Sequence, residues 1–303
     1  MRILRYVSDI HLELRKTHYL PQLASYKSFK AKPDDSNYLA LLGDIGNPFT
    51  PELNSFFKEI SPVYKQIFYV PGNHEYYNLP NFDMPKPKEE YEYKLSSICN
   101  SYPNISLLNN RSVMLDEFKI IGTTLWSHID DSHCDEIEQT LNDYHLIKNS
   151  DGRKIIVADT NRWNKEAVEF ISQEINNTPH STPCIVLTHH SPLFSNPDLG
   201  QYTAHPKYLN TSRNQAFHNN LHNLMKLPIV GWLYGHTHYT SSFDYNGVYI
   251  GTNQLGYVRE EKQINFNPYV HINLDRIKNK LNPVMVSTDN TISTVSREDF
   301  DAL

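Results

Sequence analysis

Five short segments rich in Asp, Asn and His hold the side chains of this chain that are best suited to binding metal ions. Each follows an apolar run: Asp9-Ile10-His11, Gly43-Asp44-Ile45-Gly46-Asn47, Gly72-Asn73-His74-Glu75, Thr188-His189-His190 and Gly235-His236-Thr237-His238. Carboxylate, amide and imidazole ligands suit Mn, Fe or Zn at a catalytic centre, whereas structural zinc sites are rich in cysteine. The residue types therefore indicate a hydrolytic centre with two metal ions.

The predicted ligand set contains seven side chains from these segments: Asp9, His11, Asp44, Asn73, His189, His236 and His238. One ligand has to be shared if two ions are to lie close together, and Asp44 is the natural bridging carboxylate. Two ions about 3.5–4 Å apart lower the pKa of a bridging water towards ~7 and stabilise both oxygens of an in-line displacement. Hydrolysis of a phosphate ester is the reaction that this arrangement suits.

Two histidines next to predicted ligands have other expected roles. His74 follows the ligand Asn73 and is expected to face the substrate. There it either donates a proton to the leaving oxygen or stabilises the negative charge that grows on phosphorus. In the fourth segment His189 and His190 are both available as the ligand. The family resemblance described below favours His189, which follows the apolar run 185–187 after Thr188, and leaves His190 as a supporting or substrate-contacting residue.

Short apolar runs bounded by Gly, Pro or Asp precede the segments and predict strands buried on both faces. These strands are expected at 3–7, 38–42, 66–70, 118–125, 184–188 and 229–234, with a possible last strand at 270–274. Because the carboxyl ends of such strands share one sheet edge, ligands from distant parts of the chain converge there. Asp9 and His11, two residues apart on an extended segment, face the same side, and His236 and His238 repeat this spacing.

Helices are expected between the strands, at 52–60, 88–100, 161–175 and 214–226, from apolar residues at helical spacing and nearby stop signals. Asp159 or Thr160 is the expected N-cap of the third helix. Asn246-Gly247 between apolar flanks predicts a hairpin. Glycines expected to make tight turns precede the ligands at Gly43, Gly72 and Gly235. The alternation of strands and helices predicts a layered α/β domain with some antiparallel pairing.

The overall composition limits location and partners. The 303 residues suit one large or two small domains, and the 39% apolar fraction is enough for a buried core. A net charge of −6 without long Lys/Arg runs argues against duplex nucleic acid as a partner. Three scattered cysteines and no apolar signal segment favour reduced thiols in the cytoplasm. No apolar run reaches the ~20 residues that a membrane span needs, and the sequence leaves the oligomeric state open.

The five segments resemble the motifs of the calcineurin-like metallophosphoesterase superfamily. That pattern is DxH, GDxxD/N, GNH[DE], a single His and GHxH, and all five occur here in that order between Asp9 and His238. Further stretches resemble a branch of small single-domain bacterial-type members: 71–77, 125–127, 142–144 and 188–192. Asn142-Asp143-Tyr144 lies outside the metal motifs, and a structural role is favoured over a place at the rim of the site.

The resemblance implies a fold and a division of roles. The fold would be a four-layer α/β/β/α sandwich of two mixed sheets flanked by helices, with the dimetal site at the carboxyl ends of the strands. It would span residues 1–275, and residues 276–303 would form a C-terminal extension without an assigned role. One ion would bind Asp9, His11, Asp44 and His238, and the other Asp44, Asn73, His189 and His236. His74 matches the catalytic histidine of the family, and Asn47 fills a supporting position.

The implied activity is hydrolysis of a phosphate mono- or diester by a metal-bridging hydroxide. The substrate would be a small molecule or a nucleotide, and the cofactors two divalent or trivalent ions of Mn, Fe, Zn or Ni, with Mn favoured. Three alternatives remain: a non-catalytic scaffold that binds protein partners, a nuclease of the same superfamily, and a protein phosphatase. The scaffold is disfavoured because every ligand position is filled, and the nuclease because the chain is short and acidic. No arginine-bearing motif of the protein phosphatase branch is evident.

Overall fold

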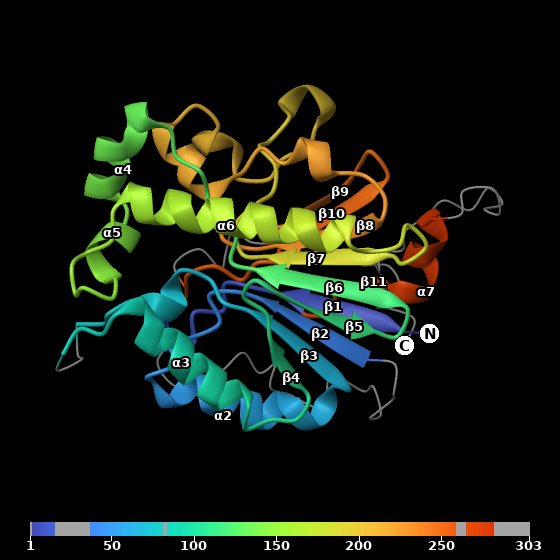
Figure 1. Ribbon diagram of the computed structural model, residues 1–303, viewed down its shortest axis with the longest axis horizontal. Helices are drawn as coiled ribbons and strands as arrows, with labels where there is room; N and C mark the ends of the chain where they lie inside the picture. Colours follow the sequence, from blue (N-terminus) through green and yellow to red (C-terminus); the bar gives the residue numbers. More distant parts are fainter. Residues whose placement is uncertain (1, 16–36, 81–83, 259–264, 282–303) are drawn as a thin grey trace.

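Two β-sheets pack face to face between outer layers of helices (Figure 1). The computed structural model describes residues 2–15, 37–80, 84–258 and 265–281. Within these residues the strand order is β11-β1-β2-β3-β4 in the first sheet and β5-β6-β7-β8-β10-β9 in the second. The inner strands are parallel, while β11, β5 and β9 run antiparallel to their neighbours. The predicted fold of two mixed sheets flanked by helices is therefore confirmed.

Two helices cover the outer face of the first sheet. Its strands are β1 (Ile3–Val7), β2 (Asn37–Leu42), β3 (Gln66–Val70), β4 (Ile105–Leu107) and β11 (His271–Asn273). The covering helices are α2 (Pro51–Ile60) and α3 (Lys88–Cys99). Pro51 is the first residue of α2, where its missing N–H costs no hydrogen bond.

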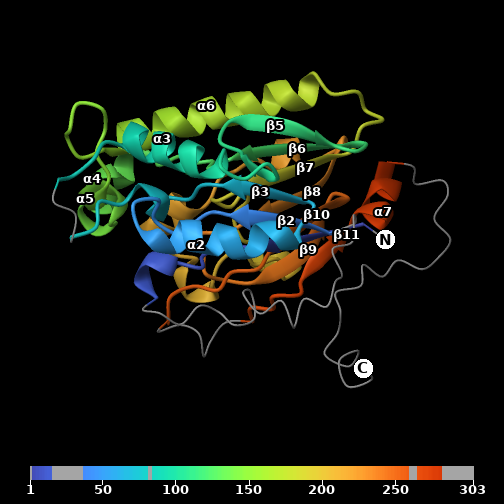
Figure 2. The same cartoon turned by 90° about the horizontal axis from the view of Figure 1, so that it is seen from below.

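The second sheet lies under one long helix, α6 (Val157–Asn176), on the side away from α2 and α3 (Figures 1 and 2). Its strands are β5 (Arg111–Leu115), β6 (Phe118–Thr123), β7 (Cys184–Thr188), β8 (Ile229–Tyr234), β9 (Ser241–Tyr245) and β10 (Val248–Thr252). The remaining α-helices are short: α4 (Cys134–Thr140), α5 (Asp143–Leu146) and α7 (Leu274–Ile277). None of the described helices is long and apolar enough to cross a bilayer.

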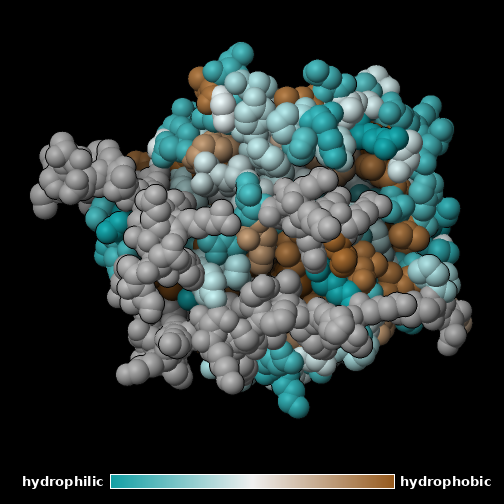
Figure 3. All heavy atoms as spheres, turned by 180° about the vertical axis from the view of Figure 1, so that it is seen from behind, coloured by the Kyte–Doolittle hydropathy of each residue, from teal (hydrophilic) through white to brown (hydrophobic). Residues whose placement is uncertain are grey.

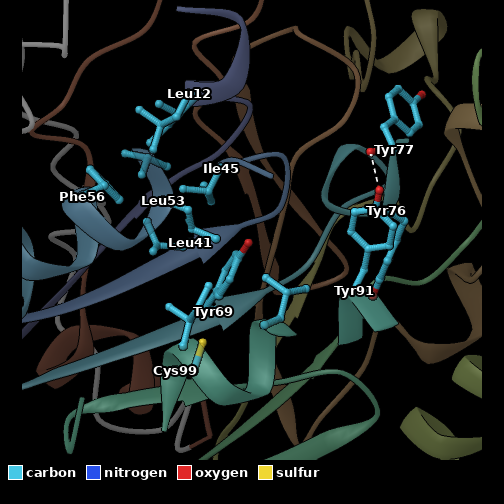
Figure 4. Close-up of a cluster of buried hydrophobic side chains, with 14 of the residues drawn as sticks. Leu12, Leu41, Ile45, Leu53, Phe56, Tyr69, Tyr76, Tyr77, Tyr91 and Cys99 are labelled. Carbon is cyan, nitrogen blue, oxygen red and sulfur yellow. Dashed lines mark hydrogen bonds between the residues drawn. The ribbon is translucent and has the colours of Figure 1, made fainter. Parts of the chain in front are cut away.

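Alternation along the strands builds the core in layers. In β2, Leu39 and Leu41 pack outward against α2, whereas Tyr38, Ala40 and Leu42 pack inward against the second sheet. Both faces are buried, which explains the continuous apolar runs in the sequence. Figure 4 shows the outer layer, where side chains from β2, α2 and β3 meet. A third cluster fills the space between the second sheet and α6.

The predicted strands agree closely with the structure. The bounds are as predicted for β1, β3, β7 and β8, while β2 begins one residue earlier and β6 ends two residues earlier. The Asn246-Gly247 hairpin is confirmed, since β9 and β10 pair antiparallel on either side of it and both turn residues have positive φ. Residues 282–303, most of the predicted C-terminal extension, lie outside the described residues, so the domain boundary stays a prediction. Ile277, just beyond residue 275, joins the core between the sheets.

The prediction for the start of the long helix is wrong by several residues. The helix α6 begins at Val157, so that Asp159 and Thr160 lie inside its first turn and neither is the N-cap. The Asp159 carboxylate accepts a hydrogen bond from the backbone N–H of Ile156 at 3.0 Å. It also accepts one from the Arg153 guanidinium at 2.7 Å. The first turn is therefore stabilised from within, and the helix extends further towards the N-terminus than its apolar spacing indicates.

The predicted helix at 214–226 does not form. Two 3-10 turns, Ser212–Phe217 and His222–Leu224, are separated by residues 218–221, of which His218 is extended. The backbone N–H groups of Asn219 and Leu221 donate to the carbonyls of Ser191 and Pro192 at 2.8 and 3.0 Å. Pairing with this neighbouring segment replaces helical hydrogen bonds, so His218 and His222 share no helix face.

The molecular surface mixes polar and apolar side chains. Figure 3 shows hydrophobic side chains gathered near the centre of one face beside hydrophilic ones. Large exposed apolar residues come from separate elements, such as Tyr93 in α3, Met114 in β5 and Leu199 in the turn Pro197–Leu199. Single exposed apolar residues of this kind are ordinary on protein surfaces.

Candidate metal centre

The loops that follow β1, β2, β3, β7 and β8 bring the seven predicted ligands to one edge of the two sheets. In the first group the Nε2 atoms of His11 and His238 are 3.1 Å apart. Nε2 of His238 lies 3.3 Å from Oδ1 of Asp9. One ligand atom from each of these three residues lies within 4.8 Å of the other two, close enough to hold one ion.

The second group forms around His189. Its Nε2 lies 3.0 Å from Oδ1 of Asn73, 3.1 Å from Nδ1 of His236 and 3.4 Å from Oδ1 of Asp44. The other oxygen of Asp44, Oδ2, lies 3.9 Å from Nε2 of His11 in the first group. Asp44 therefore stands between the two groups, at the position that a bridging carboxylate requires.

The donor atoms fit metal ions. Nδ1 of His189 donates to the backbone carbonyl of Leu42 at 2.8 Å, which leaves Nε2 as the ring nitrogen that faces Nδ1 of His236, 3.1 Å away. Neutral imidazole nitrogens that face each other at 3.1 Å in a buried site repel each other unless a proton or a cation is shared among them. The oxygen and nitrogen donors without sulfur match Mn, Fe, Zn or Ni.

Charge interactions reinforce this fit. Burial acts to raise the pKa of Asp44, but His189 and His74 hold that pKa well below its usual range. Burial likewise acts to lower the pKa of His189, and Asp44 raises it to about 9. The cluster therefore attracts positive charge.

The backbone at the site is strained. Five predicted ligands have positive φ: Asp9, His11, Asp44, His236 and His238, with values between 48° and 72°. Residues other than glycine adopt this left-handed region rarely, because it costs about 1–3 kcal/mol of stability for each residue. Strain of this kind is most frequent at functional sites. The prediction that Asp9 and His11, and likewise His236 and His238, lie on extended segments is therefore wrong, because these residues adopt left-handed turns and strand alternation does not set the directions of their side chains.

Glycines permit the loops to approach closely. Gly43 has a φ of +84°, as the predicted tight turn requires, but Gly72 and Gly235 are not in the left-handed region. A Cβ at Gly72 would lie 2.2 Å from Oδ1 of Asp44, and one at Gly235 would lie 2.7 Å from Oγ of Ser8. At these two positions close contact, rather than turn geometry, excludes a side chain.

Glu75, the last residue of the third motif, joins two ligand loops, a role that was not predicted for it. Its fully buried carboxylate accepts hydrogen bonds from the backbone N–H groups of Asp44, Ile45 and Gly72 at 2.9, 2.7 and 2.7 Å. The hydroxyl of Tyr69 donates at 2.8 Å. Burial and the charge of Asp44 raise the pKa of Glu75 to about 7, against the effect of these donors. Glu75 thereby fixes the Asp44 loop against the Asn73 loop.

Asp143 orients the amide of Asn73. Nδ2 of Asn73 donates to Oδ1 of Asp143 at 2.7 Å, so that Oδ1 of Asn73 faces His189. The hydroxyl of Tyr77 donates to the same Asp143 oxygen at 2.5 Å. The structural role favoured for residues 142–144 therefore includes direct support of a predicted ligand.

His74 lies beside the first group with its ring held at both nitrogens. Nδ1 is 3.2 Å from Oε1 of Glu13, and Nε2 is 3.1 Å from the hydroxyl of Tyr257 and 4.0 Å from Oδ2 of Asp44. Burial lowers the pKa of this imidazole, but Asp44 and Glu13 more than offset that effect, and the pKa lies above its ordinary value. Glu13 and Tyr257 are further site residues that sequence reasoning missed.

Asn47 and His190 lie behind the cluster. Nδ2 of Asn47 donates to the carbonyl of Tyr77 at 2.9 Å, and its Oδ1 accepts from the N–H of Phe49 at 3.0 Å. Nδ1 of His190 donates to the carbonyl of Thr124 at 3.3 Å. Burial lowers the pKa of His190 to about 3, so this imidazole is neutral. Their supporting roles, and the choice of His189 over His190 as ligand, stay predictions that this arrangement supports.

The chain belongs to the calcineurin-like phosphoesterase family, which it matches over residues 4–240. It is 50% identical over 282 residues to Uncharacterized protein L509 of Acanthamoeba polyphaga mimivirus, across 91% of this chain and 98% of that protein. Its fold is similar to that of Phosphopantetheinyl Hydrolase (PptH) from Mycobacterium tuberculosis, with a TM-score of 0.66 and 18% identity over 86% of this chain and 92% of that chain. Family and cluster together support a metal-binding phosphoesterase, a hydrolase.

Proposed function

We propose that this protein hydrolyses a phosphate mono- or diester of a small molecule or a nucleotide with two metal ions, of which Mn is favoured. The position of Asp44 between the two ligand groups carries the proposal. One ion would be held by Asp9, His11, Asp44 and His238, and the other by Asp44, Asn73, His189 and His236. When bound, such a pair supplies a nucleophilic water of lowered pKa and neutralises charge on the phosphoryl oxygens.

The protein's own side chains prepare the site for this chemistry. The hydrogen bond to Leu42 fixes the His189 tautomer, and Asp143 fixes the Asn73 amide, so that neither ligand has to reorganise. Six of the seven ligands are buried and His238 is half-buried, which limits access of bulk water and strengthens electrostatic interactions within the site. His74 donates a proton from Nε2 to the leaving oxygen, the general acid step that contributes about 10²–10⁴-fold in enzymes.

Hydrolysis of 4-nitrophenyl phosphate and bis(4-nitrophenyl) phosphate tests the proposal. Purified protein is first loaded with Mn²⁺, Fe²⁺, Zn²⁺ or Ni²⁺, and its metal content is measured by elemental analysis. We expect metal-dependent release of 4-nitrophenolate from at least one ester. No turnover of either ester at two ions per chain, with all four metals, would contradict a general phosphoesterase. Protein that resists loading would instead favour the scaffold alternative.

We also propose a cytoplasmic protein that acts on a small phosphoester rather than on duplex nucleic acid. The cysteines Cys99, Cys134 and Cys184 are all unpaired thiols. Burial raises the pKa of Cys99 to about 12 and that of Cys184 to about 11, so these thiols are unreactive. Unpaired thiols suit a reducing compartment.

A further inference from the structure

Glu13 is a buried carboxylate at the site that neither the ligand set nor the proposed reaction uses. It lies in the 3-10 turn Leu12–Leu14, directly after the β1 loop, and its side chain is 1% exposed. Its Oε1 lies 3.2 Å from Nδ1 of His74, and its Oε2 has no hydrogen-bond partner among the described residues. Burying a carboxylate is costly unless it has a specific partner, which indicates a function at this position.

We propose that Glu13 is a positioning residue that orients His74 for proton donation, an inference that rests on the proposed phosphoesterase function. A carboxylate only accepts hydrogen bonds, so Nδ1 of His74 has to carry a proton. The other nitrogen, Nε2, then points to the hydroxyl of Tyr257 and the Oδ2 side of Asp44. The ring plane is fixed further by Tyr77, whose ring centroid lies 4.2 Å away.

Competing assignments fit the contacts less well. Oε1 of Glu13 is also 3.5 Å from Nδ1 of His11, but that nitrogen forms no hydrogen bond within the described residues. Asn47, the supporting residue of the second motif, cannot orient His74. Its amide nitrogen donates to the backbone carbonyl of Tyr77, and its amide oxygen accepts from the backbone N–H of Phe49. Glu13 is therefore the carboxylate that the described structure places on Nδ1 of His74.

The first test reads the tautomer of His74 without relying on activity. Long-range ¹H–¹⁵N spectra of the metal-free protein, at a pH where His74 is neutral, report which ring nitrogen carries the proton. The signal is assigned by its loss in His74→Ala. We expect the proton on Nδ1 in the wild type and on Nε2, the form that free imidazole side chains favour, in Glu13→Ala. The same tautomer in both proteins, or a wild-type proton on Nε2, overturns the proposal.

The second test compares leaving groups. Phenyl and 4-nitrophenyl esters are compared with metal-loaded protein, as mono- or diesters according to the preference of the wild type. Phenolate is the more basic leaving group and depends more on a proton from His74. We expect Glu13→Ala to lower kcat by about 10–100-fold on the phenyl ester and clearly less on the 4-nitrophenyl ester. Glu13→Gln keeps an acceptor oxygen and should restore most of the loss.

Controls separate this role from others. Leu14→Ala changes the next residue of the same turn, whose side chain is 48% exposed, and should match the wild type in both tests. Equal losses on both esters, or loss of metal from Glu13→Ala, overturn the proposal in favour of a structural role or of support for His11. If the wild type hydrolyses neither ester, the proposed function fails, whereas the tautomer measurement still decides whether Glu13 positions His74.

Discussion

The substitution Gly72→Ala tests whether close packing of the loops holds the predicted bridging carboxylate in place. A Cβ at this position would lie 2.2 Å from Oδ1 and 2.7 Å from the backbone N of Asp44. It would also lie 2.7 Å from Nε2 of His189. Gly72 has no positive φ, so the substitution adds no backbone strain and acts through sterics alone.

The magnitude follows from these distances. An ordinary contact is 3.4–4 Å, so the Asp44 carboxylate has to move by about 1 Å. Its backbone cannot yield easily because Glu75 holds the N–H of Asp44 at 2.9 Å. Overpacking of this kind costs about 1–3 kcal/mol of folding stability. A misplacement of about 1 Å in a catalytic group lowers activity by about 100-fold. We therefore expect a moderately destabilised protein that binds metal weakly and turns over slowly.

The assay measures metal content, unfolding by urea and ester hydrolysis on the same samples. Gly152→Ala is the matched control, because a Cβ there meets nothing within 4 Å although φ is +78°. That variant should lose about 1–2 kcal/mol of folding stability, because alanine is strained in the left-handed conformation, and it should keep its metal and activity. Wild-type metal content and turnover in Gly72→Ala would refute the placement of Asp44 between the two ligand groups.

Three further predictions follow from the site and from the N-terminal ion pairs. Asp44→Ala should lose both metal and activity, whereas His74→Ala should keep its metal while kcat falls by about 10²–10⁴-fold. Elemental analysis measures the metal content of both variants, and ester hydrolysis measures their kcat. Full turnover by His74→Ala would contradict the assignment of His74 as the general acid. Removal of metal by a chelator should lower the melting temperature, and Mn²⁺ at about 1,000 times its Kd should raise the free energy of unfolding by about 4 kcal/mol. A melting temperature that does not change with metal would contradict metal binding. Arg2 donates hydrogen bonds to Glu117 and lowers the pKa of that carboxyl from 4.5 to about 2. This stabilisation is present above pH 4.5 and is lost as the pH falls through about 2. Because the pair is largely exposed, it contributes less than about 1 kcal/mol to folding stability. The difference in free energy of urea unfolding between the wild type and Arg2→Met should therefore become smaller as the pH falls from 4.5 to about 2. A difference that grows on acidification would contradict the Arg2–Glu117 ion pair.

The predicted strands succeeded where burial on both faces leaves a strong local pattern. Runs such as Ile3–Val7 and Cys184–Thr188 are mostly apolar because each packs between a second sheet and a helical layer. The helix predicted at 214–226 failed because its backbone pairs with residues 191 and 192. That competition depends on a segment more than 20 residues away in the chain, and no local spacing reveals it.

The carboxylates that hold the site residues in place also could not be predicted from local sequence patterns. Glu13 acts on His74 across 61 positions, Glu75 on the N–H of Asp44 across 31, and Asp143 on Asn73 across 70. Each of these is a single polar contact between loops, and an isolated carboxylate in a sequence looks the same whether it is buried or solvated. The signal that was available for Glu75 was its place directly after the predicted catalytic histidine.

By itself, the sequence determined which donor atoms this chain can offer a pair of cations and at which strand ends they stand, because ligand chemistry and strand burial are both written in residue type and order. Only the tertiary structure decided how those donors are aimed: the left-handed turns at the ligands, the close approach at Gly72, and the carboxylates that orient Asn73 and His74. Orientation depends on contacts between loops that folding brings together, and such contacts have no local signature in the chain.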